Sequence, residues 1–330
     1  MRLLAVSLTV STIFLLVAVV LASLLGSEPV SLARGWTDAA SVDHAIVFEV
    51  RLPRIALAGL AGGGLAVVGC AFQSLLRNPL AEPYVLGVSG GAAFGATLAI
   101  VLGAGWIAGW GPALIPASAL LGGLVATVLV YAIAGAGTEP SGTSILLAGV
   151  IVNAIAGALI TALKSLVSAS KAQELLFWLM GFIDVPSPAT LMFIAAYVVA
   201  GSSVLMVDAG RMNLLSLGDE SARHLGVDVR SLERRVFLAC SLVVGAIVSV
   251  TGLIGFVGLV IPHALRRLIG PDHRVLLPTS LIAGAGMLVL CDMIARAAFQ
   301  WLGTEPPVGA VTALVGGPLF LVLLRKRRVG

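Results

Sequence analysis

The sequence predicts an all-α polytopic membrane protein with about ten transmembrane helices. Of its 330 residues, 59% are hydrophobic and only 11% are charged, whereas a soluble domain averages about 25% charged residues. From Pro83 through Thr138 the chain has no Asp, Glu, Lys, Arg or His. That run exceeds two bilayer crossings of about 20 residues each. Because lipid offers backbone groups no hydrogen-bond partner, we expect the crossings to be helices.

Charge-poor runs define the expected spans within a single domain covering residues 1–330. The first run follows a lone Arg2, and its length of about 25 residues exceeds the 7–15 residues of a signal-peptide core, so we count it as a span. The expected crossings are residues 3–27, 55–76, 86–104, 114–134, 143–163, 187–207, 234–253, 255–270, 275–295 and 308–324. An even number of crossings puts both termini on one side.

The basic residues predict that both termini are cytoplasmic. With that orientation 14 of the 20 basic residues fall in inner loops or at the termini, as the positive-inside rule requires. The six outer ones are Arg34, Arg51, Arg54, Lys164, Lys171 and Arg296. All five tryptophans then fall toward the outer side, where interfacial anchors are found. We therefore expect a multi-pass protein of the cell (inner, cytoplasmic) membrane.

Catalytic and metal-binding motifs are missing from the sequence. It contains no Walker A motif and no H-E-x-x-H motif, and its three cysteines lie in apolar runs without a C-x-x-C pair. His263 and His273 have no partner at metal-ligand spacing. We expect no catalytic residue, metal or cofactor, and a pore whose energy comes from another subunit.

Small residues are frequent inside the expected spans. The second span carries Gly59, Gly62, Gly63, Gly64 and Gly69. Glycines at helical spacing allow helix backbones to approach closely in lipid. They predict tight helix packing.

Two segments at the membrane surface are more polar or more broken than a connector requires. Arg51-Leu-Pro-Arg54 places two outer arginines on one side of a helix start, which fits either headgroup anchoring or docking of an acidic partner. Arg77-Asn-Pro-Leu-Ala-Glu-Pro83 cannot continue a helix because of its two prolines. It is either a simple inner turn or part of a constriction at the inner mouth.

The longest inner loop runs from Asp208 to Arg235 and is rich in charge. Asp219 and Glu220 suit a helix N-terminus, and Gly226 suits the position after a helix end. We expect a short charged helix against the cytoplasmic face, presenting a surface for a cytosolic partner.

Together these segments resemble one family. The motifs R-L-P-R, R-N-P-L-A-E-P-x-x-L-G-V-S-G-G, L-G-D-E-S-A-R-H-L-G-V, G-F-V-G-L-V-I-P-H and E-P-P-V-G-A-V-T-A-L-V-G-G-P occur in family order between Arg51 and Arg325. They resemble the FecCD-type permeases of ABC importers for iron-siderophores, haem and vitamin B12. One departure is Tyr84, at a position where a small residue is common.

The resemblance implies a type II importer permease, with a second permease copy (a homodimer), a cytosolic ATPase dimer and a periplasmic or lipid-anchored binding protein. It implies ATPase coupling within a loop of about 209–233, through Leu217, Gly218, Asp219, Glu220, Ala222, Leu225 and Gly226. It implies docking of the binding protein by Arg51, Arg54 and Arg296. It implies a cytoplasmic gate at Asn78, Leu80, Thr143 and Ser144.

Two questions stay open at this point. Within the family, a ferric siderophore is the first expected substrate, with vitamin B12 and haem as alternatives. A different class, a proton-coupled secondary transporter, would depend on Lys164, Asp292 or Arg296, the ionisable residues nearest the span interiors.

Overall fold

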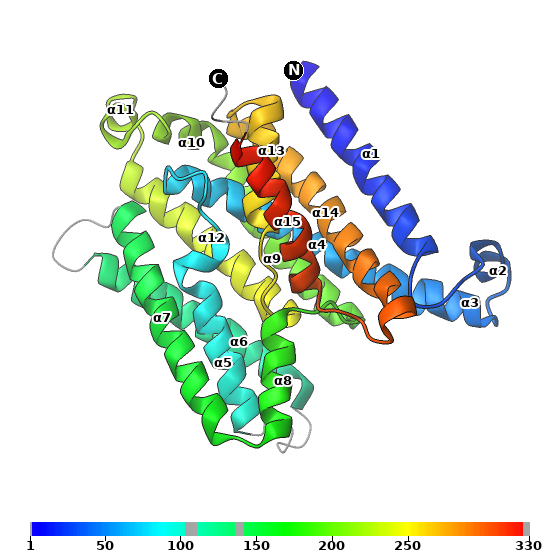
Figure 1. The fold of residues 1–330 in the computed structure, drawn as a ribbon. Helices are drawn as coiled ribbons and strands as arrows, with labels where there is room; N and C mark the ends of the chain where they lie inside the picture. Colours follow the sequence, from blue (N-terminus) through cyan, green and yellow to red (C-terminus); the bar gives the residue numbers. More distant parts are fainter. Residues whose placement is uncertain (1, 103–110, 136–141, 326–330) are drawn as a thin grey trace.

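The computed structural model describes residues 2–102, 111–135 and 142–325, and these residues form helices and loops without a strand (Figure 1). Ten helices match the ten predicted crossings. They are α1 (Arg2–Leu24), α4 (Leu52–Leu75), α5 (Val88–Val101), α6 (Gly111–Ala134), α7 (Gly142–Leu166), α9 (Pro188–Val207), α12 (Val229–Thr251), α13 (Val257–Ile269), α14 (His273–Leu302) and α15 (Val308–Arg325). Among the described residues, seven helices are long and apolar enough to cross a bilayer, and α5 and α15 are shorter apolar helices. The tenth, α13, has 13 residues and belongs to neither group. The predicted all-helical membrane fold is confirmed.

Shorter helices connect the spans at the two ends of the bundle. They are α2 (Leu32–Thr37), α3 (Val42–His44), the π-helical η1 (Ala45–Arg51), the 3₁₀ turn η2 (Pro83–Leu86), α8 (Ala169–Met180), α10 (Ala209–Leu215) and α11 (Asp219–His224). The start of α1 and the end of α15 lie on the same side as α10 and α11, opposite to α2 and α3 (Figure 1). Following the predicted orientation, we call the side of α10 and α11 the inner side.

Local sequence features explain where several helices begin. Ser187 accepts a hydrogen bond from the Thr190 amide at the start of α9, and Asp228 accepts one from the Ser231 amide at the start of α12. At the start of α14, the side chain of Asp272 accepts a hydrogen bond from the Arg274 amide. Each cap satisfies an amide that the first helical turn leaves free.

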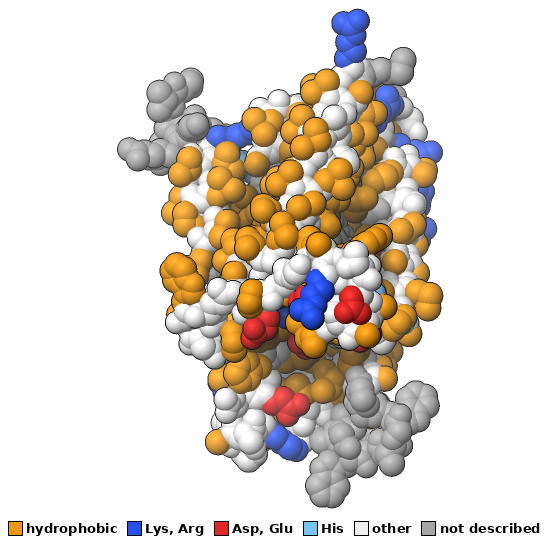
Figure 2. All heavy atoms as spheres, turned by 90° about the vertical axis from the view of Figure 1, so that its right-hand side faces the viewer, with side chains coloured by type: hydrophobic (Ala, Val, Ile, Leu, Met, Phe, Trp, Pro, Cys, Tyr) orange, Lys and Arg blue, Asp and Glu red, His pale blue; other side chains and the backbone are white. Residues whose placement is uncertain are grey.

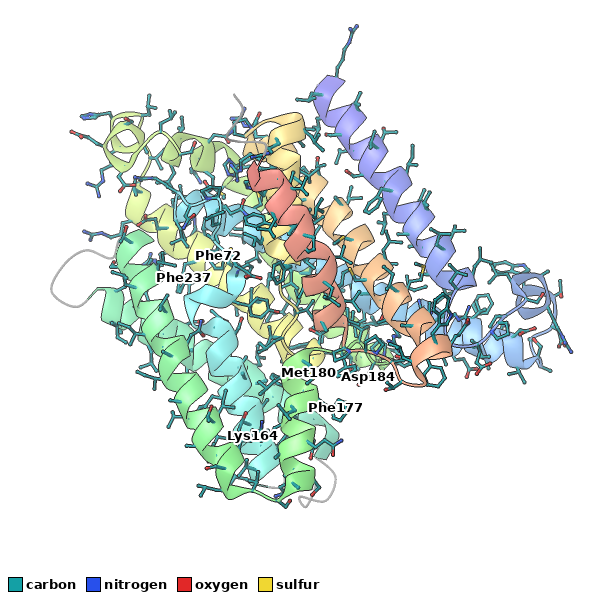
Figure 3. The ribbon with its side chains drawn as sticks, in the orientation of Figure 1. Phe72, Lys164, Phe177, Met180, Asp184 and Phe237 are labelled. Atoms are coloured by element: carbon teal, nitrogen blue, oxygen red, sulfur yellow. The ribbon has the colours of Figure 1, made fainter. Side chains whose placement is uncertain are left out.

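The core surrounds α4, the most buried long helix, which packs against α9, α12, α13 and α14. A Cβ at Gly62 would overlap the carbonyl of Gly284 in α14, and one at Gly69 would overlap the carbonyl of Gly258 in α13. The predicted tight packing is therefore confirmed at backbone-to-backbone contacts. Aromatic packing adds to it, since the rings of Phe72 and Phe237 join α4 to α12 with centroids 6.3 Å apart (Figure 3).

The outermost helix, α1, exposes apolar side chains along most of its length. Val6 and Val10 are each 60% exposed, and hydrophobic side chains cover this face of the molecule (Figure 2). Such a surface is unstable in water and suits contact with lipid tails. The fold thus places a packed core around α4 and a lipid-facing surface on α1.

Candidate functional site

The long inner loop folds into α10 and α11, as its caps predict. Asp219 and Glu220 form the first turn of α11, and Gly218 and Gly226, both at positive φ, flank the helix. Positive φ is a conformation that glycine adopts without strain. The helix expected at this loop is confirmed.

The side chains of this loop, residues 208–228, divide between packing and exposure. Leu217 and Leu225 are exposed, at 64% and 57%, whereas Ala222 is fully buried. Exposed leucines at the inner face are costly in water unless a partner covers them. Ala222 instead packs α11 onto the bundle.

Asp208 anchors the base of the loop. Its carboxylate accepts hydrogen bonds from Arg211 at 2.7 Å and from two nitrogens of Arg235 at 3.0 and 3.1 Å. Burial raises the pKa of Asp208, but the bonds from Arg235 and Arg211 outweigh burial and hold this pKa below its ordinary value. The loop therefore stays fixed to α9 and α12 at neutral pH.

An ion pair connects α11 to the loop that follows α4. The guanidinium of Arg77 donates to the carboxylate of Asp219. Arg77 has a positive φ of 47°, an uncommon backbone conformation for a residue with a side chain. Asn78, one of the predicted gate residues, is the next residue in the chain. The ion pair therefore connects α11 directly to the loop that carries Asn78.

The predicted gate residues lie around the inner end of α4. The side-chain oxygen of Asn78 accepts a hydrogen bond from the Leu80 amide at 2.9 Å, and the Leu80 side chain is half exposed. Thr143 and Ser144 lie in the first turn of α7, which begins at Gly142. A Cβ added at Gly142 would lie 2.8 Å from the carbonyl oxygen of Leu75 in α4. The structure thus brings the start of α7 against the end of α4.

Two side chains of the same loop hold the break between α12 and α13. A carboxylate oxygen of Glu82 accepts a hydrogen bond from the Phe256 amide at 2.7 Å, and the Tyr84 hydroxyl accepts one from the Ile254 amide. Burial raises the pKa of Glu82, and the bond from Phe256 partly offsets this. Tyr84 therefore fastens α12–α13 to the inner loop, which explains a large side chain there.

At the outer side, the three predicted docking arginines are buried. Arg51, Arg54 and Arg296 are 3%, 9% and 4% exposed. Arg51 donates to the carbonyls of Ser23, at 2.7 Å, and Leu24, and Arg296 donates to those of Ala22, at 3.0 Å, and Leu25. Basic side chains thus satisfy the free carbonyls at the end of α1. They do not lie on a free surface in this conformation.

Asp292 and Glu305 complete the outer cluster, a role that we did not expect for either residue from the sequence. Asp292, fully buried, accepts from Arg54 and from Arg296 at 3.0 Å each. The second nitrogen of Arg54 donates to Glu305 at 2.9 Å. The i, i+4 spacing of Asp292 and Arg296 is the sequence feature from which their ion pair could have been predicted. The pair also engages Asp292 and Arg296, two of the three ionisable residues on which a proton-coupled transporter would depend.

A cavity of about 470 Å³ opens near this cluster, lined by segments of α5, α6, α8, α12 and the turn before α15. Its carboxylates are Glu174, Asp184 and Glu305. Phe177 on α8 and Asp184 in the segment after α8 lie on the same side of the bundle (Figure 3). A second cavity, of about 620 Å³, shares Asp184. We call the first cavity the outer mouth. Its lining is acidic, although Glu305 is paired with Arg54, and it is wide enough for a small molecule.

Residues 14–326 match the model of the FecCD transport family. The chain belongs to the FecCD transport family. It is 44% identical over 284 residues to the cobalamin import permease BtuC of Halobacterium salinarum, covering 86% of this chain and 74% of that one. It is 35% identical over 329 residues to the hemin transport permease HmuU of Yersinia pestis, covering 96% and 95%.

A solved structure agrees with this membership. A metal-chelate type ABC transporter in an inward-facing conformation superimposes with a TM-score of 0.85 at 34% identity, covering 98% of this FecCD permease and 99% of that chain. This FecCD permease is thus a multi-pass membrane subunit of an ABC importer. The family resemblance read from the ordered motifs is confirmed.

Proposed function

We propose that this permease imports a metal chelate into the cytoplasm, driven by a separate dimeric ATPase bound at α10–α11. The observation that carries the coupling part of this proposal is the ion pair between Arg77 and Asp219. The chelate class rests on the relatives and on the solved metal-chelate type transporter. The ion pair joins an exposed inner loop, which suits a cytosolic partner, to the loop bearing Asn78 and Leu80. Force applied at α11 by the ATPase would move that loop and open the gate formed with Thr143 and Ser144.

Cobalamin is the chelate that we place first. A relative at 44% identity is a cobalamin import permease, and the acidic outer mouth disfavours strongly anionic cargo. This changes the order expected from the sequence, in which a ferric siderophore came first, with haem as a further alternative. The experiment that decides among the three substrates measures ATP-dependent uptake into reconstituted vesicles. Labelled cobalamin, haemin and ferric siderophore are offered separately.

The binding protein would dock at the outer side at Arg54, the one of the three predicted arginines that pairs with a partly exposed carboxylate. Arg51 and Arg296 would stay bonded to the carbonyls at the end of α1. In the present conformation Arg54 is paired with Glu305, and the Glu305 side chain is 29% exposed. A carboxylate of the docking protein would displace Glu305 from the guanidinium, an exchange between equivalent acceptors. A second copy of the permease would complete the passage as a homodimer.

Exchanging the charges of Arg77 and Asp219 tests the coupling proposal. Arg77→Asp alone should lower the substrate imported per ATP hydrolysed about 2- to 30-fold, the range for coupling energies of about 0.5–2 kcal/mol. Adding Asp219→Arg should restore much of the loss. The fold should survive, because both partners are 42% exposed and such pairs contribute little stability.

The matched control is Arg234→Asp, which changes an exposed arginine at the same inner face. Transport and ATP hydrolysis are measured together in vesicles containing permease, ATPase and binding protein. An unchanged ratio in Arg77→Asp, or an equal loss in Arg234→Asp, would show that the ion pair does not carry the coupling.

A further inference from the structure

An apolar groove of about 550 Å³ lies between α1 and α9, with α4 and α14 as its floor. Ser202 is the only polar side chain that lines it. The others are hydrocarbon, among them Leu15 of α1, Val198 of α9, and Leu281 and Ala285 of α14. A groove of this composition suits an aliphatic chain.

A second cavity, which we call the inner pocket, lies at the inner ends of α9 and α14, beside α10. It measures about 720 Å³, and its lining includes Met206, Val207, Arg211, Leu214 and Arg274. Two arginines therefore face the same space as three apolar side chains. This combination of charge and hydrocarbon is typical of the membrane interface.

The groove and the inner pocket lie along the same helix faces. On α9, Val198 and Ser202 of the groove precede Met206 of the pocket at intervals of four residues. On α14, Arg274 of the pocket precedes Leu281 and then Ala285 of the groove at intervals of seven and four. Residues at these intervals share one side of a helix. The two cavities share no lining residue, but they follow one another along these helix faces from the inner end toward mid-membrane, and we call the two together the strip.

The dimensions of the strip match one membrane leaflet. Arg274 and Ala285 are eleven residues apart on α14, which at 1.5 Å per residue spans about 16 Å. Half of a bilayer's hydrocarbon core is about 15 Å. The flanking helices face lipid, because Val10 on α1 and Val199 on α9 are about 60% exposed.

The charge at the inner pocket is positive. Arg274 forms no ion pair with a carboxylate in residues 2–102, 111–135 and 142–325, and a Cβ at Gly210 would lie 2.9 Å from its guanidinium. Arg211 pairs with Asp208 yet keeps a 55% exposed side chain. The charged side chains that line the pocket are Arg211 and Arg274. Just outside it, Asp208 pairs with Arg211 and Arg235, and Asp272 interacts with Arg274. These three arginines and two carboxylates leave one positive charge for an anion.

We propose that this strip binds an anionic phospholipid of the inner leaflet. Its phosphate lies between Arg211 and Arg274, and one acyl chain lies in the groove between α1 and α9. The site shares α10 and Arg211 with the base of the coupling loop, and it is separate from the gate and the outer cluster. The lipid fills a space that the chain itself leaves open and secures α1 to the bundle.

The test uses the full-length permease purified in mild detergent and stripped of lipid. Phosphatidylglycerol or phosphatidylcholine is added back, and bound lipid is counted by native mass spectrometry while the unfolding temperature is recorded. Arg211→Gln with Arg274→Gln should weaken phosphatidylglycerol binding about 30-fold, since each arginine near an anionic surface contributes about fivefold. The matched control, Arg267→Gln, removes an exposed arginine outside the pocket and should bind like the wild type.

Stronger binding and stabilisation by phosphatidylglycerol than by phosphatidylcholine, lost in the double variant alone, supports the proposal. Equal binding of the two lipids would overturn it, because the arginines would then play no part. Stabilisation by inorganic phosphate alone, equal to that by phosphatidylglycerol, would also overturn it and indicate a free-anion site. Ala285→Leu, which narrows the groove, should weaken phosphatidylglycerol but leave any phosphate effect unchanged.

Discussion

Asp292→Ala is expected to destabilise the permease by about 3–5 kcal/mol, the cost of removing one partner from a buried charge cluster. Asp292 is fully buried and accepts one hydrogen bond from Arg54 and one from Arg296. Without it, two buried guanidiniums face each other with fewer acceptors. The end of α1 is also affected, because Arg296 positions its carbonyls.

The measurement is unfolding of the purified protein in detergent, by temperature or by added denaturing detergent. Glu49→Ala is the matched control, since Glu49 in η1 is an exposed carboxylate on the same outer side. Surface substitutions of that kind change stability by about 0.5 kcal/mol or less. If both variants unfold like the wild type, Asp292 does not hold the outer cluster together.

Gly69→Ala is expected to be the most damaging single-methyl insertion in the core. The added Cβ would overlap the carbonyl oxygen of Gly258, which is backbone and cannot rotate away. Helices α4 and α13 would have to separate, at a cost at or above the upper end of the about 1–3 kcal/mol typical of overpacking. Glu82 and Tyr84 hold the start of α13, so the inner loop would be disturbed as well.

Two other glycines provide controls for this substitution. A Cβ at Gly59 would have its nearest neighbours at 3.9 Å, and one at Gly157 would have none within 4 Å. Both are helical, so Gly59→Ala and Gly157→Ala should be neutral or stabilising. Yield and unfolding temperature of the three variants are compared side by side. Equal behaviour of all three would contradict close packing of α4 on α13.

The helices and their ends could be predicted from the sequence because their causes are local. Hydropathy over about 20 residues sets the spans, and Asp228 or Gly226 beside a helical segment sets an end. The inner helix α11 followed from Asp219 and Glu220 in the same way. Such features require no knowledge of which helices are neighbours.

The contacts of the candidate sites could not be predicted because they join distant parts of the chain. Arg54 and Asp292 are separated by 238 residues, and Glu82 and Phe256 by 174. No periodicity relates residues so far apart. For the same reason the outer arginines looked available for a partner, although the structure directs them to Asp292 and to the end of α1.

The central claim is that this permease moves a metal chelate only when a separate ATPase drives it. The most direct measurement is uptake of labelled cobalamin into vesicles containing permease, ATPase and binding protein, with and without ATP. Haemin and ferric siderophore are run in parallel. Uptake of at least one chelate that stops without ATP, and without the ATPase, is the predicted result. Uptake that continues without the ATPase but follows a proton gradient would contradict the account.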